Sequence, residues 1–79
     1  MGRQPTFGER VRHFRELAGL KQAKLARQVG VTQSAVQQWE TDSTEPTHAH
    51  LEAIAKACGV ELRIFFGDIG EADDVERAS

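Results

Sequence analysis

The sequence has few of the features that mark secreted or membrane proteins. It contains one cysteine among 79 residues, Cys58, so no disulfide can form within the chain. No apolar run of about 7–15 residues follows Met1, which argues against a signal peptide. No apolar run approaches the roughly 20 residues that a membrane-spanning helix needs. We therefore expect a soluble, cytoplasmic protein that has no membrane segment.

Patterns typical of catalytic and metal sites are also missing. His48 and His50 are two positions apart, so they diverge on a helix, and His13 has no partner at metal-ligand spacing. The sequence shows no paired carboxylates, no nucleophile–base arrangement and no phosphate-binding loop. A chain of this length is one small domain with little room for a pocket. We therefore expect no enzyme activity, no cofactor, no metal and no small-molecule effector.

The net charge is small, but the charged residues are unevenly distributed along the chain. The net charge of −2 would by itself argue weakly against binding to nucleic acid. Residues 1–29, however, carry seven Lys or Arg and two Glu, a balance of +5, whereas residues 30–79 carry three and ten, a balance of −7. A partner responds to the charges within a Debye length of about 8–10 Å. The basic first part therefore leaves a nucleic-acid partner open.

Apolar residues recur three and four positions apart along most of the chain, which is the period of an α-helix. Thr6 can cap a helix, and Glu9 three residues later completes a capping box. Other threonines and glycines stand where helices would begin and end, namely Thr32, Thr47, Gly19, Gly30 and Gly59. We therefore expect an all-α fold, a compact bundle of five short helices at residues 7–18, 22–29, 33–40, 48–58 and 60–66.

The two C-terminal segments are less regular. Residues 60–66, "VELRIFF", have the length of a strand, but a lone strand would have nothing to pair with in an otherwise helical chain, so a helix is expected. Residues 67–79 are acidic and are expected to form a mostly disordered tail. The chain is thus expected to consist of one domain at 1–66 and a tail at 67–79.

The helical period also assigns a core face to each segment. The residues on these faces are Val11, Phe14, Leu17, Ala18, Ala23, Leu25, Ala26, Val29, Ala35, Val36, Trp39, Leu51, Ile54, Ala55, Cys58 and Phe65. Cys58 is accordingly expected to be a small core residue, and Trp39 a core anchor.

The third predicted helix has an unusual polar face. At 100° per residue, one side carries Ala35, Val36 and Trp39, and the other carries Gln33, Ser34, Gln37 and Gln38. A solvated face normally contains Glu, Lys and Arg. A glutamine amide instead offers a donor and an acceptor that match the N6 and N7 edge of adenine in the major groove. We interpret this face as one that reads bases; the alternative is a chance cluster of ordinary surface glutamines.

The joint before this helix has the spacing of a helix-turn-helix, because only "GV" and a cap separate two short helices. The segment "LKQAKLARQVGVTQSAVQQWE" (20–40) resembles the phage-repressor and Cro-like, or Xre-like, helix-turn-helix family. The segment "EPTHAHLEAIAKACGV" (45–60) resembles the part that follows in that family. The resemblance covers about 6–66. It implies a lambda-repressor-like fold and a transcriptional regulator that binds a palindromic operator in double-stranded DNA through its third helix.

The resemblance also implies roles for single residues. Base reading falls to Gln33, Ser34 and Gln38, with Gln37 a less regular contact, and DNA backbone contacts fall to Lys21, Gln22, Thr32 and Thr44. Gln22 would also brace Gln33, and Arg15 would form an internal salt bridge with Glu40. The loop 41–45 departs from the family because it lacks a glycine and basic residues. Its two carboxylates, Asp42 and Glu45, are expected to weaken contact with phosphates.

The family implies a homodimer, because one such module covers few base pairs. Ile64 and Phe66 cannot both be buried on one side of a short helix, so one of them is a candidate dimer contact; the alternative is simple packing against the first helix. A different class of function is also open. The chain could be a protein-interaction module of the same fold, such as an antitoxin-like partner of another protein.

Overall fold

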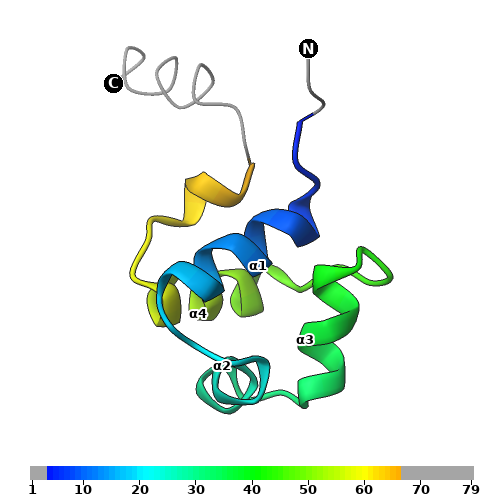
Figure 1. The fold of residues 1–79 in the computed structure, drawn as a ribbon, viewed down its shortest axis with the longest axis vertical. Helices are drawn as coiled ribbons and strands as arrows, with labels where there is room; N and C mark the ends of the chain where they lie inside the picture. The colour runs from blue at the N-terminus through cyan, green and yellow to red at the C-terminus, as the bar shows by residue number, and fades with distance from the viewer. Residues whose placement is uncertain (1–3, 67–79) are drawn as a thin grey trace.

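The computed structural model describes residues 4–66, which form a bundle of helices (Figure 1). The elements are α1 (Phe7–Leu17), α2 (Gln22–Val29), α3 (Gln33–Glu40), α4 (His48–Cys58) and a short 3-10 helix, η1 (Leu62–Phe66). This part of the chain contains no strand. The expected all-α class is confirmed, with the fifth helix present as a 3-10 helix. The tail predicted at 67–79 lies outside the described residues.

Three threonines cap the helices as predicted. Thr6 Oγ1 accepts from the Glu9 backbone N–H at 3.1 Å, and Glu9 Oε1 accepts from the Thr6 N–H at 2.9 Å, which is a complete capping box. Thr32 and Thr47 accept from backbone N–H groups three residues later, each at 3.1 Å. Each cap satisfies an N–H that has no partner within its helix.

The joint between α2 and α3 is tight because Gly30 adopts a left-handed conformation with φ of 91°. Both Gly30 and Val31 donate their backbone N–H to the Ala26 carbonyl, at 2.8 and 2.9 Å. The chain therefore turns sharply before Thr32 starts the next helix. Figure 1 shows the result: α2 is seen nearly end-on while α3 is seen from the side.

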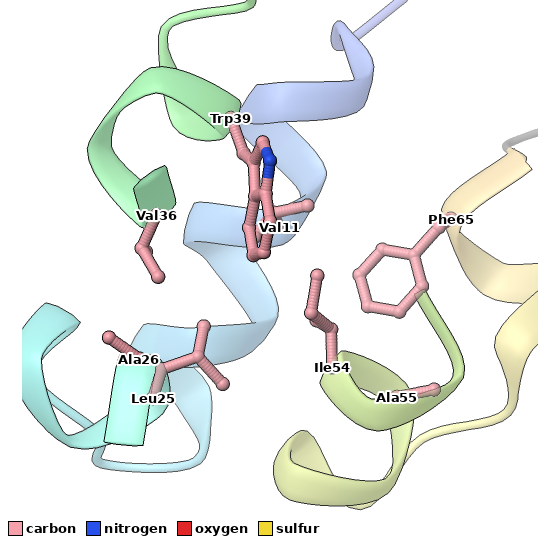
Figure 2. Packing of buried hydrophobic residues seen from close by; sticks show 8 residues of the cluster. All are labelled: Val11, Leu25, Ala26, Val36, Trp39, Ile54, Ala55 and Phe65. Carbon is pink, nitrogen blue, oxygen red and sulfur yellow. The ribbon is translucent and has the colours of Figure 1, made fainter. Parts of the chain in front are cut away.

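All five helices contribute to one core. Val11, Leu25, Val36 and Ile54 are completely buried, one from each of α1 to α4. Phe65 of η1 closes the core between the rings of Phe7 and Phe14, with centroid distances of 6.0 and 5.9 Å. Figure 2 shows the buried side chains converging on one space, with the Phe65 ring beside Ile54. The predicted burial of Phe65 is confirmed, and η1 is therefore part of the folded unit.

Three residues that were expected in the core are exposed. Leu17 has 69% of its surface exposed, and Ala18 and Ala23 are also exposed. At about 100° per residue, Leu17 lies roughly 120° around α1 from Val11, whereas Arg15 lies only about 40° away and takes the inward position. The inward position near the C-terminal end of α1 thus belongs to Arg15, which the family resemblance places in an internal salt bridge.

Cys58 is half-buried and packs against the core. Burial raises the pKa of its thiol above the ordinary value, opposed by the charge of Arg15. At pH 8 the thiolate fraction is thus smaller than in the unfolded chain. We expect an alkylating reagent to modify Cys58 several-fold more slowly in the native protein than in urea. Equal rates would contradict this placement, and a cysteine-containing peptide in both solvents controls for the effect of urea on the reagent.

Candidate nucleic-acid interface

The polar face of α3 points away from the core. Gln33, Ser34, Gln37 and Gln38 are all exposed, whereas Val36 and Trp39 are buried and Ala35 is half-buried. The helix lies along one side of the molecule (Figure 1). The predicted direction of these four side chains is confirmed. Four neutral groups that can donate and accept hydrogen bonds thus form one accessible row.

A buried ion pair holds α3 against α1. Arg15 donates to Glu40 through Nε at 2.6 Å and through Nη2 at 3.1 Å, and both residues are only 8% exposed. Arg15 Nη1 also donates to the Leu20 carbonyl at 2.8 Å, so the ion pair extends to the chain before α2. The hydrogen bond to Glu40 raises the pKa of the Arg15 guanidinium, while burial opposes the shift. The predicted internal salt bridge is present, and Arg15 is not available to an external partner.

Gln22 connects this ion pair to the exposed face of α3. Its Nε2 donates to Glu40 Oε1 at 3.0 Å, and its Oε1 accepts from Gln33 Nε2 at 3.5 Å. Gln22 is half-buried at the first position of α2, and Gln33 is exposed at the first position of α3. The expected contact between the two glutamines is therefore present, and Gln22 also donates a hydrogen bond to Glu40.

The loop after α3 is tied to the start of α1. Asp42 has a φ of 63°, which an aspartate tolerates better than most residues. Its Oδ1 accepts from the Gly8 backbone N–H at 2.9 Å, at the N-terminus of α1, where the helix dipole favours a negative charge. That Asp42 can adopt a left-handed conformation and preserve the turn was expected from the sequence, together with a repulsive effect on phosphates; the contact with Gly8 was not. The partner is 34 positions away in the chain, so residue spacing could not predict it.

The residues predicted to contact the DNA backbone lie at both ends of α3. Thr32 is exposed and caps α3, and Lys21 is exposed at the N-cap position of α2, beside Gln22, which contacts Gln33 at the start of α3. Thr44 is exposed near its end, and its backbone N–H lies 3.4 Å from the Gln38 carbonyl. Lys24 and Arg27 of α2 are exposed as well. The predicted contacts thus flank the polar row instead of being scattered over the molecule.

Of the two candidate dimer residues, the structure describes the side chain of Ile64 only. Ile64 packs against the core and stays half-exposed. The side chain of Phe66 lies outside the described residues. Its contribution to a dimer contact therefore stays a prediction.

The histidines pair locally. His48 Nε2 lies 3.2 Å from Glu52 Oε2, and the His50 ring lies 5.4 Å from the Trp39 ring. Within residues 4–66, no three His, Cys, Asp or Glu side chains are grouped as metal ligands would be. No helix in the same range is long and apolar enough to span a bilayer.

Comparison with known sequences finds a match to the family described as Helix-turn-helix over residues 11–65. The chain is 44% identical over 51 residues to Repressor protein C2 of Salmonella phage P22. The aligned region covers 65% of this chain and 24% of the repressor. It is 36% identical over 66 residues to an uncharacterized transcriptional regulator in the ATPase CF(0) region of Rhodospirillum rubrum, covering 84% of this chain and 61% of that protein. The chain thus spans about a quarter and three-fifths of these relatives.

Comparison with solved structures also finds a repressor in complex with an operator and a controller protein, both of which share this fold. The P22 c2 repressor in complex with synthetic operator 9T matches with a TM-score of 0.72 and 37% identity, covering 76% of this chain and 91% of that one. The restriction-modification controller protein C.AhdI from Aeromonas hydrophila matches with a TM-score of 0.71 and 30% identity, covering 75% and 89%. The sequence match, the shared fold and the α2–α3 joint agree, and the chain belongs to the helix-turn-helix family.

Proposed function

We propose that this chain is a sequence-specific transcriptional regulator that binds double-stranded DNA in the cytoplasm, as a repressor or self-regulating controller, and is not an enzyme. The observation that carries the proposal is the row of four exposed neutral polar side chains on α3. It is supported by the likeness to the P22 c2 repressor, whose structure was solved on an operator. Each glutamine amide can pair with a base edge through one donor and one acceptor.

The elements around α3 suit docking into the major groove. The first turn of α2 has backbone N–H groups without helical acceptors, and Lys21 has no side-chain cap bond there. Such an N-terminus binds phosphate, and the Lys21 ammonium adds attraction. Thr44 at the far end of α3 could contact the same backbone further along. Two phosphate anchors of this kind fix the register in which Gln33, Ser34 and Gln38 meet the bases.

We further propose that the protein acts as a homodimer on a palindrome. One helix of this length reads few base pairs, and two-fold dimers place half-sites about one helical turn apart, roughly 34 Å. Ile64 and Phe66 of η1 are the candidate contacts between subunits. Under this proposal, control follows from the concentration of the protein, since none of its described features suggests an effector site.

Selection of bound DNA from a random pool tests this function. We expect a palindrome with half-sites one turn apart. Gln33→Ala and Gln38→Ala should each weaken binding to it by about 1–3 kcal/mol, the value of one bidentate base contact, measured by titration at fixed salt. Gln28→Ala on the exposed side of α2 is the matched control and should leave affinity unchanged. A folded wild type that enriches no sequence would contradict the proposal and favour the protein-interaction alternative.

A further inference from the structure

A chain of hydrogen bonds runs from the buried ion pair to the outer face of α3. Glu40 faces the charged guanidinium of Arg15, which donates to both carboxylate oxygens at 2.6 and 3.1 Å. An ionised carboxylate has no proton to donate, so it can only accept from its remaining neighbour. That neighbour is Gln22, 3.0 Å from Glu40 Oε1. The charge of Glu40 therefore decides which end of the Gln22 amide faces it.

The orientation of Gln22 determines what it offers to Gln33. With Nε2 turned to Glu40, Gln22 presents Oε1, which accepts from Gln33 Nε2 at 3.5 Å. The reverse orientation would set the amide oxygen against the carboxylate and lose a hydrogen bond to a charged group. Gln22 is half-buried, so the lost bond would be only partly replaced by water. The buried carboxylate of Glu40 thus sets the orientation of the Gln22 amide.

The orientation of the Gln22 amide limits which hydrogen-bonding groups Gln33 can present to a base. An amide nitrogen carries two N–H groups, and one of them is directed at Gln22. One N–H and the Oε1 acceptor stay free. This pair suits adenine, which offers the N7 acceptor and the N6 donor in the major groove. Guanine offers two acceptors, N7 and O6, and would need both N–H groups of Gln33.

We infer that Glu40 is a positioning residue for base selection: through Gln22 it orients the Gln33 amide so that Gln33 accepts adenine and discriminates against guanine. The inference rests on the proposed function, because it names the base that one side chain of the proposed interface selects. It gives the buried acid a role beyond holding α1 to α3. A merely structural acid would hold the helices without affecting the choice of base.

Two variants separate the two roles. Glu40→Gln keeps an amide of similar shape but can donate or accept, so it no longer dictates the orientation of Gln22. Gln22→Met removes the connection and leaves the Arg15–Glu40 pair intact, which serves if Glu40→Gln folds poorly. Gln28→Met makes the same change at an exposed position of α2 and is the matched control. Circular dichroism and urea unfolding establish that each variant is folded under the binding conditions.

The measurement is the ratio of affinities for two duplexes that differ only by adenine or guanine at one position. To identify that position, bound DNA is selected from the random pool with the wild type and with Gln33→Ala. It is the position whose base preference is lost in the variant. We expect the wild type to prefer adenine there, and the ratio to fall at least about fivefold in Glu40→Gln and in Gln22→Met, the lower range of one bidentate contact. Gln28→Met should keep the wild-type ratio.

Three results would overturn the inference. The first is a wild-type preference for a base other than adenine at this position. The second is an unchanged ratio in folded Gln22→Met, even if its affinity falls equally for both duplexes, as the loss of a phosphate contact would produce. The third is a folded wild type that binds no DNA, which overturns the proposed function together with the inference. In the first two cases the proposed function stands.

Discussion

Replacement of Glu40 by alanine should destabilise the protein by about 3–5 kcal/mol, the usual effect of removing one partner of a buried ion pair. Arg15 is only 8% exposed in the folded protein, and the change would deprive its Nε and Nη2 of the carboxylate that accepts from them. A domain of this size has a free energy of unfolding of roughly 4–12 kcal/mol, so the loss is a large part of the total. Urea unfolding, with the midpoint and slope determined separately, measures it.

The control for burial is an exposed ion pair within α1. Arg12 and Glu16 form a salt bridge at 3.2 Å whose side chains are 65% and 54% exposed. Arg12→Ala should therefore cost less than about 0.5 kcal/mol. Replacing both buried partners, Arg15→Met with Glu40→Leu, should recover much of the loss because no charge is left unpaired. If Glu40→Ala were as mild as Arg12→Ala, the pair would not be buried as described.

Alanine at Gly8 should also be strongly destabilising, by about 3 kcal/mol, at the upper end for overpacking. A Cβ at this position would lie 2.4 Å from the Trp39 carbonyl oxygen and 2.6 Å from that of Glu40. Both atoms belong to the backbone at the end of α3, so neither can move aside as a side chain could. We expect the midpoint of thermal unfolding to fall by more than about 10 °C.

Gly19→Ala is the matched control because it adds the same methyl group to a glycine with no atom within 4 Å of the new Cβ. Its φ of 77° makes this change unfavourable by only about 1 kcal/mol, from backbone conformation alone. Equal effects at the two positions would mean that α1 does not pack against the end of α3. A larger effect at Gly8 would support the contact that also aligns its N–H with Asp42.

Most of the helices were predictable because their signals are local. Thr6, Thr32 and Thr47 lie next to the residues that they cap, and Gly30 turns the chain where it stands. The exposed polar row of α3 follows from the same local geometry, since 100° per residue separates Gln33 from Val36 whatever the neighbours are. These predictions needed no information about distant contacts.

Predictions that depended on distant neighbours were less accurate. Leu17 was expected inside and is exposed, because the inward position near the end of α1 belongs to Arg15, whose partner Glu40 lies in a distant helix. The Asp42–Gly8 contact joins residues 34 positions apart, and no pattern in the sequence indicated it. The pairing of Arg15 with Glu40 was expected through family resemblance rather than through spacing.

The sequence by itself determined where α1 to α4 begin and end, to within one residue, and which face of α3 is polar, because caps, turns and helical periodicity act within a few residues. Only the tertiary structure decided that Arg15, Glu40, Gln22 and Gln33 are linked by successive hydrogen bonds. These side chains come from three helices, and their distances depend on how the core packs. Hydrogen bonds require separations defined to a few tenths of an ångström, which packing provides and local sequence does not.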